Sequence, residues 1–332
     1  MIATDEQVPE SGPILEIPEL TVDFSNGGRW VRAVDHVSLR VLRGECVCLT
    51  GESGCGKTTT ALAISRLLPV PPTRYASGSI LVGGEDVLKM SEEELRRLRG
   101  RIISYVFQEG GGALNPVFRV GTQVLEGLRL HRPAAATASE VVRLLRMVGV
   151  PAPELTRHSY PRQLSGGTQQ RVAIAVALAS QPSLLIADEP TAQVDPTIQA
   201  QIVDVFRTLK RELGMSILLI THNFGIVSEL GDRVAVMYAG QVVESARTQD
   251  LLDRPLHPYT QALIRSVPGL REGGERLAGI PGTAPSADAM PSGCRFHPRC
   301  AIARADCAAE SPALRQVEPG RWVRCPYWKE GG

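Results

Sequence analysis

The sequence Gly51-Glu52-Ser53-Gly54-Cys55-Gly56-Lys57-Thr58 decides the fold of this chain. It follows the apolar run Glu45 to Thr50, which predicts a buried strand, and leads into Thr58 to Leu68, whose periodicity predicts a helix. Glycines let consecutive backbone N–H groups turn inward around phosphates, and a helix N-terminus adds its positive end. The order of strand, glycine loop and helix therefore predicts a nucleotide phosphate site, in which Lys57 contacts the β- and γ-phosphates and the Thr58 hydroxyl binds Mg²⁺.

The charge balance excludes some function classes. The chain has 332 residues, with Lys plus Arg (36) nearly equal to Asp plus Glu (35). This balance gives no broad electrostatic footprint for nucleic acid or for an anionic membrane surface. No apolar run approaches the roughly 18 to 20 residues that a membrane-spanning helix needs, and the first residues, Met1 to Ser11, are too acidic and polar for a signal peptide. We therefore expect a soluble protein of the cytoplasm.

Strand-like and helical segments alternate along the chain. Apolar runs at Leu184 to Ala187, Ile217 to Ile220 and Val234 to Tyr238 predict strands, and Ile198 to Leu213 predicts a helix between the first two. This alternation predicts an α/β core with a largely parallel sheet. Helical periodicity dominates from about Val120 to Leu178 and indicates an inserted helical subdomain.

Near the N-terminus, Ile14 to Val22 and Val37 to Val41 predict short strands around a turn at Asn26-Gly27-Gly28. Beyond about Leu256, proline, glycine and cysteine replace the periodic pattern. We therefore divide the chain into a flexible tail (1–13), a main domain (14–255) with its helical subdomain at about 109–178, and a C-terminal extension (256–332).

Two adjacent acids, Asp188 and Glu189, end the predicted strand Leu184 to Ala187. Neighbouring carboxylates repel each other, and such a pair persists where a divalent cation or a catalytic water uses it. We expect Asp188 to hold Mg²⁺ through water and Glu189 to polarise the attacking water.

A third motif makes the combination specific. Leu164-Ser165-Gly166-Gly167-Thr168-Gln169-Gln170-Arg171 matches the signature loop of the ATP-binding cassette family, so the chain resembles that family. The resemblance implies a P-loop NTPase (RecA-like) core with an inserted helical subdomain and an antiparallel β subdomain, followed here by a small Cys-rich C-terminal domain. It also implies a head-to-tail dimer, in which the signature loop of one subunit contacts ATP held by the other.

The resemblance assigns further roles one residue at a time. Gln108 corresponds to the glutamine that senses Mg²⁺ and water, His222 to the histidine at the γ-phosphate, and Asp195 to the aspartate that communicates between sites. Phe24 and Trp30 are both candidates for the aromatic side chain that stacks on adenine. The residues expected to bind ATP in one subunit are Gly51, Glu52, Ser53, Gly54, Cys55, Gly56, Lys57, Thr58 and Thr59, and those expected to contact the partner's ATP are Ser165, Gly166, Gly167 and Thr168.

Three positions depart from the family pattern. Thr168 stands where many members have Gln, Ala192-Gln193-Val194-Asp195 replaces the usual Ala-Leu-Asp form, and Asn223 follows the histidine where Asp is common. None of these changes removes a phosphate, metal or water ligand. We therefore expect a half-site that is competent for hydrolysis.

The resemblance narrows to the ATPase subunits of oligopeptide, dipeptide and nickel importers. This narrower resemblance rests on three stretches: Ala113-Leu114-Asn115-Pro116, His257-Pro258-Tyr259-Thr260 and the cysteine-rich end. It implies a second ATPase chain, identical or different, two membrane subunits that dock a short helix near Gln108, and an external binding protein. Peptide is the expected substrate; nickel, glutathione or another small solute stays open. Two other classes also stay open, a soluble cassette ATPase of DNA repair or translation and a regulatory module that binds nucleotide without hydrolysis.

Four of the seven cysteines lie near the C-terminus, as Cys294-x5-Cys300-x6-Cys307-x17-Cys325. The segment is too poor in apolar residues to fold by burial alone, so a metal centre is expected to stabilise it. Zinc prefers closer spacing within ligand pairs, and longer gaps with Pro326 after the last cysteine suit a [4Fe–4S] cluster. Zinc and unligated thiols or redox disulfides stay as alternatives, while the resemblance favours iron and sulfur.

The other three cysteines carry less information. Cys46 and Cys48 lie two apart on one predicted strand and are expected in the core. Cys55 lies in the phosphate loop near a helix N-terminus, which predicts a lowered thiol pKa and sensitivity to oxidation.

Overall fold

The computed structural model describes residues 12–192, 194–267 and 279–330. The chain forms two compact units: unit 1 comprises Met1–Val41, Val47–Leu88 and Thr221–Gly332, and unit 2 comprises Leu42–Cys46 and Lys89–Ile220. The predicted tail 1–13 lies outside the described residues except for Gly12 and Pro13, and Pro13 already begins a strand. The other domain boundaries stay predictions.

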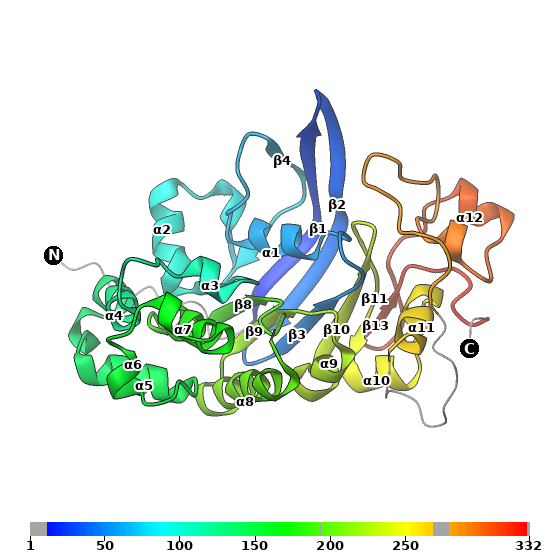
Figure 1. The fold of residues 1–332 in the computed structure, drawn as a ribbon. Helices are drawn as coiled ribbons and strands as arrows, with labels where there is room; N and C mark the ends of the chain where they lie inside the picture. Colours follow the sequence, from blue (N-terminus) through cyan, green and yellow to red (C-terminus); the bar gives the residue numbers. More distant parts are fainter. Residues whose placement is uncertain (1–11, 193, 268–278, 331–332) are drawn as a thin grey trace. The chain divides into compact units, whose positions relative to one another are not determined.

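Unit 1 contains an antiparallel sheet built on two long strands, β1 (Pro13–Asn26) and β2 (Arg29–Leu42), which run side by side in Figure 1. Both strands are longer than the sequence pattern predicted, and the predicted turn holds, with Gly27 and Gly28 at φ +55° and +83°. The strand order is β2-β1-β5-β6, and β4 also pairs with β1. The short strands are β4 (Thr73–Ser77), β5 (Leu81–Val82) and β6 (Glu85–Asp86), followed by the 3-10 turn η1 (Val87–Lys89).

The second sheet carries the phosphate loop. Its strands in unit 1 follow the order β12-β13-β11-β10-β3, in which β3 and β10 are parallel and the other pairs are antiparallel. Every residue of β3 is buried, as expected for a parallel strand covered on both faces. The strands are β3 (Cys46–Thr50), β10 (Arg233–Tyr238), β11 (Gln241–Arg247), β12 (Arg315–Glu318) and β13 (Arg321–Val323). The helices of this unit are α1 (Lys57–Ile64), α9 (Phe224–Leu230), α10 (Thr248–Asp253), α11 (Pro258–Arg265), η4 (His297–Arg299) and α12 (Ala305–Ala309).

The helix after the phosphate loop is shorter than predicted. It ends at Ile64 rather than Leu68, because Arg66 adopts the left-handed conformation at φ +48° and cannot continue the helix.

Unit 2 contains three parallel strands in the order β9-β8-β7, namely β7 (Ile103–Val106), β8 (Leu184–Asp188) and β9 (Ser216–Ile220). All residues of β8 and β9 are buried. Long helices precede and follow β8: α7 (Gly166–Leu178) is capped by Ser165, and α8 (Pro196–Leu213) is capped by Asp195. The parallel strands in both units confirm the predicted α/β class, and the β1 sheet is the expected antiparallel β component.

The predicted helical insertion is also present in unit 2. Figure 1 shows α4, α5, α6 and α7 gathered into one group, and α7 packs against both α4 and α5. The remaining helices of the unit are α2 (Glu92–Arg101), α3 (Gly110–Ala113), α4 (Val120–His131), η2 (Pro133–Ala135), α5 (Ala138–Met147), α6 (Pro153–Thr156) and η3 (Pro161–Gln163). Among the helices of the described ranges, none is both long and apolar enough to span a membrane.

Candidate functional site

The phosphate loop leaves the end of β3 and enters α1 at Lys57. Its glycines are required by geometry at two positions. Gly51 has φ +148°, and a Cβ there would lie 2.1 Å from the Met237 carbonyl oxygen. Gly56 has φ +104°, and a Cβ there would lie 2.7 Å from the Ala33 carbonyl oxygen. Backbone atoms of neighbouring segments lie so close to the loop that only glycine can occupy these two positions.

Lys57 lies folded over the loop. Its ammonium Nζ donates to the carbonyl oxygens of Gly51 (2.8 Å) and Glu52 (3.0 Å), and the residue is buried. Thr58 and Ser53 are exposed. The Lys57 ammonium is thus held against the loop backbone, and the exposed Thr58 stands at the start of α1. A phosphate and a metal ion need this arrangement of a cation and a hydroxyl group.

The prediction for Cys55 was wrong. The thiol is buried, and this burial raises its pKa, although the nearby Lys57 ammonium at 3.8 Å acts in the opposite direction. A helix N-terminus favours the thiolate only where the sulfur stays partly solvated, and here the loop covers it.

Asp188 ends β8 and is buried. Its Oδ2 accepts a hydrogen bond from the Tyr105 hydroxyl at 2.9 Å. Burial and the Asp188 carboxylate both raise the pKa of Tyr105, so this phenol remains a donor at neutral pH. Tyr105 therefore orients the Asp188 carboxyl group through this hydrogen bond.

Glu189 follows directly and has φ +47°, in the left-handed region. A residue with a Cβ adopts this conformation only where its surroundings enforce it, and such strain gathers at functional sites. The backbone N–H of Glu189 donates to the Ile220 carbonyl at 2.9 Å, which fixes the turn at the end of the parallel strands. The side chain is half-buried, so water can reach it.

Gln108 is exposed in the loop after β7, and α7 anchors that loop. The side chain of Gln170 accepts from the Gly110 N–H at 2.7 Å and donates to the Phe107 carbonyl at 3.5 Å. Gln170 is only 4% exposed. The helix that begins at the signature loop therefore also holds the backbone on both sides of Gln108.

Replacing Gln170 by Met is expected to lower the free energy of unfolding by about 1–3 kcal/mol, because the buried Gly110 N–H loses its acceptor. ATP hydrolysis should fall as well, since the backbone beside Gln108 loses its anchor. Urea unfolding of the variant measures the first effect. As a control, Gln249→Met removes an exposed amide that bonds Asp253 and should change stability by less than about 0.5 kcal/mol. Equal effects at both positions would contradict this role for Gln170.

The signature loop opens α7, with Ser165 as its N-cap. The Ser165 hydroxyl accepts from the Thr168 N–H at 3.3 Å and lies 3.0 Å from the Thr168 hydroxyl. The two glycines differ. A Cβ on Gly167 would lie 2.5 Å from the Ile198 side chain, whereas a Cβ on Gly166 would meet nothing within 4 Å. Packing inside the chain thus explains glycine at 167 but not at 166.

Asp195 and Asn223 both act as helix N-caps. The Asp195 carboxylate accepts from the Thr197 and Ile198 N–H groups, each at 3.0 Å, and Asn223 caps α9 through the Gly225 N–H at 2.9 Å. Asn223 thereby keeps the helix start fixed next to the exposed His222, and the departure from Asp leaves this cap intact. Gln193 lies outside the described residues.

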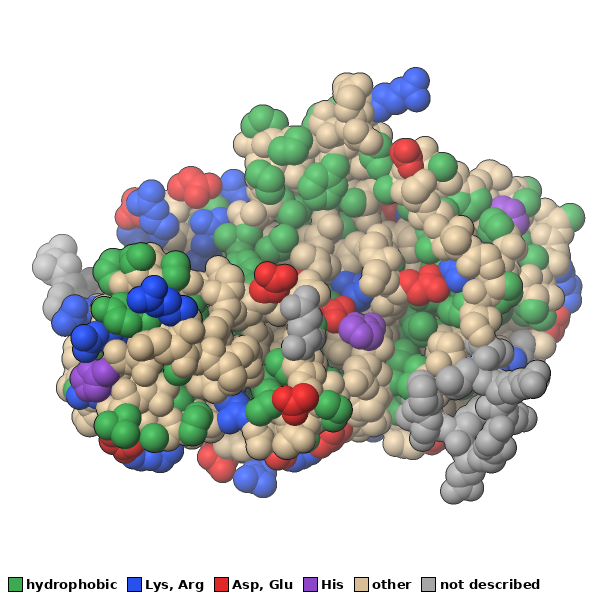
Figure 2. Space-filling model, in the orientation of Figure 1, with side chains coloured by type: hydrophobic (Ala, Val, Ile, Leu, Met, Phe, Trp, Pro, Cys, Tyr) green, Lys and Arg blue, Asp and Glu red, His purple; other side chains and the backbone are tan. Residues whose placement is uncertain are grey.

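The predicted ATP residues divide between the two units. Unit 1 holds the phosphate loop and His222, and unit 2 holds Gln108, Asp188, Glu189 and the signature loop. Their joint arrangement around ATP stays a prediction. Figure 2 shows side chains of both charge signs scattered over the visible face, in line with the balanced composition.

Both candidates for adenine stacking lie on the long strands of unit 1. Trp30 is 46% exposed, and the Arg74 guanidinium lies 4.2 Å from the centre of its ring. Phe24 is half-buried and pairs with Thr73 in the β1–β4 ladder. Trp30 therefore has the larger accessible surface of the two.

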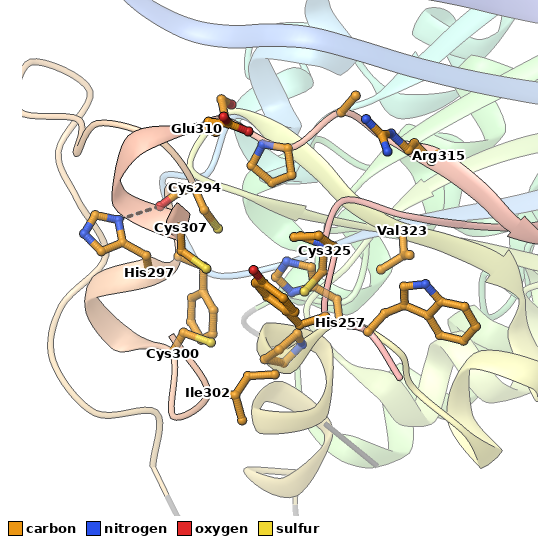
Figure 3. Close-up of a pocket in the computed structure, with 18 of the residues that line it drawn as sticks. His257, Cys294, His297, Cys300, Ile302, Cys307, Glu310, Arg315, Val323 and Cys325 are labelled. Carbon is orange, nitrogen blue, oxygen red and sulfur yellow. Dashed lines mark hydrogen bonds between the residues drawn. The ribbon is translucent and has the colours of Figure 1, made fainter. Parts of the chain in front are cut away.

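The four C-terminal cysteines line one cavity of about 530 Å³ in unit 1. In Figure 3 the side chains of Cys294, Cys300, Cys307 and Cys325 turn toward this cavity, whereas the ring of His297 points away and bonds the Cys294 carbonyl at 2.9 Å. Burial raises the pKa of Cys294 and Cys300, and burial with the neighbouring thiols raises the pKa of Cys325 to about 12. Within the ranges that the structure describes, no group of three or more His, Cys, Asp or Glu side chains is arranged to hold a metal ion.

Several residues of the site were missed by the sequence reasoning. Tyr105 and Gln170 lie inside segments recognised for other reasons, and Tyr259 was noted only as part of a motif. Arg299 had one signal, its position next to Cys300. The Tyr259 hydroxyl accepts from the Glu52 N–H at 2.9 Å, and the Arg299 guanidinium bonds the Glu52 carboxylate. Both residues therefore belong to the phosphate loop's surroundings.

Comparison with known proteins identifies the family of the chain. Residues 34–192 match the ABC transporter family, and residues 243–307 match the family described as "Oligopeptide/dipeptide transporter, C-terminal region". A protein of Brucella abortus (strain 2308) that is named for peptide import and ATP binding is 43% identical over 319 residues, 96% of each chain. A similarly named protein of Brucella ovis is 44% identical over 331 residues, covering 96% of this chain and 98% of its own.

A solved structure adds the fold. A dimeric ATP-binding cassette in a post-hydrolysis state, bound to ADP and Pi, superimposes with a TM-score of 0.64 and 27% identity, over 70% of this chain and 98% of its own. The chain therefore belongs to the ATP-binding proteins of the ABC transporter family, and it is an ATPase of that family.

Proposed function

We propose that this chain is the ATP-hydrolysing subunit of an importer that takes up peptides. The identity of 43% over 96% of both chains to a protein named for peptide import carries this proposal. The match of residues 243–307 to the oligopeptide/dipeptide transporter region supports it.

The site residues take the following roles in this proposal. Lys57 and the phosphate-loop N–H groups bind the β- and γ-phosphates. Thr58, Asp188 and Gln108 would hold Mg²⁺, which would neutralise charge on the phosphate oxygens. Glu189 removes a proton from the attacking water, and His222 contacts the γ-phosphate. Ser165, Gly166, Gly167 and Thr168 of one subunit face the ATP of the other. Trp30 stacks on adenine in preference to Phe24, because more of its ring is accessible.

The proposed partners are a second ATPase subunit, two membrane permease subunits and, indirectly, an external substrate-binding protein. The chain would lie on the cytoplasmic face of the membrane. Exposed apolar side chains at Val117 and Phe118, which are 71% and 51% exposed, follow the Gln108 loop and α3. They offer an apolar contact for a short permease helix beside Gln108.

Uptake of labelled peptide tests the substrate. In cells that lack this chain, the wild-type protein should restore uptake of a labelled dipeptide or oligopeptide, and the Glu189→Gln variant should not. Restored uptake of nickel or glutathione, without peptide, would show that the importer carries a different solute.

We also propose that Cys294, Cys300, Cys307 and Cys325 hold one [4Fe–4S] cluster. Four cysteine thiols around one cavity are the usual donor set for such a cluster. Burial raises the pKa of three of these thiols, and a bound metal centre would supply positive charge that favours their thiolate forms.

Metal analysis after anaerobic purification tests this ligand set. We expect a brown protein with about four irons and about four sulfides per chain, and loss of the colour in Cys300→Ser. Cys46→Ala, in the buried strand β3, is the matched control and should retain the iron. A colourless protein with one zinc per chain would show a structural zinc site in place of the cluster. A protein without any metal would refute the proposal that these cysteines bind a metal centre.

A further inference from the structure

An acidic residue lies inside the phosphate loop. Glu52 is its second residue, five positions before Lys57, and its side chain is 27% exposed. A carboxylate near a bound triphosphate would repel it, so a compensating positive charge at Glu52 would favour ATP binding. The structure supplies that charge from a residue 247 positions later in the chain.

Arg299 forms a two-pronged ion pair with Glu52. Nη1 donates to Oε2 at 2.8 Å, and Nη2 donates to Oε1 at 3.0 Å. This fork geometry fixes both the charge and the direction of the carboxylate. The Arg299 side chain is only 6% exposed, so water screens the pair weakly.

Other contacts hold the Arg299 side chain in place. Its Nε donates to the Pro281 carbonyl at 2.8 Å, its Nη1 lies 3.4 Å from the Tyr238 hydroxyl, and its guanidinium carbon lies 5.7 Å from the centre of the Tyr238 ring. The position of the Glu52 carboxylate is therefore set by a rigid partner rather than by a mobile surface arginine.

The backbone of Glu52 is held as well. Its N–H donates to the Tyr259 hydroxyl, and its carbonyl accepts from Lys57 Nζ. The Tyr259 ring in turn packs against Phe296, with ring centres 5.4 Å apart. Phe296 and Arg299 both lie between Cys294 and Cys300. This short segment therefore supports Glu52 twice, through the Arg299 ion pair and through the packing of Phe296 against Tyr259.

Two further arginines tie the cysteine-rich segment, 294–325, to other parts of unit 1. Arg295, next to Cys294, donates to the Asp35 carboxylate at 2.6 Å, and Arg324, next to Cys325, donates to the Val242 carbonyl at 3.0 Å. The backbone that carries Arg299 is therefore anchored on both sides of its ion pair.

We propose that Arg299 is a positioning residue for the ATPase reaction: it neutralises Glu52 and holds the phosphate loop in the form that binds ATP. Through Arg299, the cysteine-rich segment 294–325 influences the affinity of the phosphate loop for ATP. This inference rests on the proposed phosphate site, but it concerns how that site is prepared rather than whether it exists.

Binding of a fluorescent ATP analogue to the purified full-length chain tests the proposal. Arg299→Met should weaken binding about tenfold or more, because an unpaired carboxylate then faces the phosphates. Adding Glu52→Gln to Arg299→Met should recover most of the affinity, since the double variant carries no unpaired charge. Arg299→Lys should lie between wild type and Arg299→Met, because a lysine keeps the charge without the fork. The Michaelis constant for ATP should rise in parallel, with a smaller effect on the turnover number.

Arg304→Met is the matched control. Arg304 lies in the same stretch and pairs with Glu330, and about half of each of these two side chains is exposed, so its loss should leave ATP affinity unchanged. A double variant that binds no better than Arg299→Met, or an Arg299→Met variant that binds as wild type does, would overturn the proposal. If Arg299→Met fails to fold, the other two variants decide. The proposal would also be overturned if Arg299→Lys bound ATP as tightly as wild type while the Glu52→Gln/Arg299→Met double variant bound it weakly. A wild-type chain that binds no nucleotide would instead refute the phosphate site itself.

Discussion

Replacing Glu189 by Gln is expected to slow ATP hydrolysis by about 100-fold or more, because general-base catalysis contributes roughly 10² to 10⁴ in rate. The amide keeps the size and the hydrogen-bonding reach of the side chain but cannot accept the proton of the attacking water. Binding of ATP should persist, since the proposed phosphate contacts come from Lys57 and the loop N–H groups. Glu189 directly follows the buried Asp188, and its backbone is in the left-handed region.

Phosphate release and analogue binding, measured on the same preparation, separate the two steps. Glu212→Gln is the control, because Glu212 is an exposed carboxylate of the same unit, at the end of α8. It should hydrolyse ATP at the wild-type rate. Hydrolysis by Glu189→Gln within about threefold of wild type would exclude the general-base role, since that loss is far below the contribution of such a base.

Replacing Gly166 by Asp should abolish hydrolysis without loss of stability. A Cβ at this position meets nothing within 4 Å, and a carboxylate in the first turn of α7 interacts favourably with the helix N-terminus by about 0.3–1 kcal/mol. Thermal unfolding of the variant should therefore match the wild type. ATPase activity should fall by about 100-fold or more, because the new charge would face the γ-phosphate held by the partner subunit.

Mixing two inactive variants tests the head-to-tail arrangement. When Gly166→Asp and Glu189→Gln chains are combined, a mixed dimer has one site with both defects and one site with neither. Activity should then rise above that of either variant alone. Gly279→Asp, at another exposed glycine with open space around its Cβ, serves as the control and should be fully active. A mixture that stays inactive would contradict a site shared between subunits.

The sequence by itself determined the family, and it predicted the reacting groups. The phosphate loop, the Asp188-Glu189 pair and the signature loop are each contiguous, and their function depends on local backbone geometry. A glycine loop between a strand and a helix, or a serine at a helix N-cap, can be inferred from neighbouring residues alone. For the same reason the alternation of strands and helices predicted the α/β class, although the ends of α1 and of the long N-terminal strands were missed.

Only the tertiary structure decided which side chains support those groups. Arg299 meets Glu52 across 247 positions, and Tyr105 meets Asp188 across 83 positions, so no local pattern could pair them. The tertiary structure also decided the pKa of Cys55. The place of Cys55 in the sequence predicted a lowered thiol pKa, but burial in the folded chain raises that pKa. Charge, desolvation and hydrogen bonding depend on what packs against a residue, and in this chain those neighbours come from distant segments.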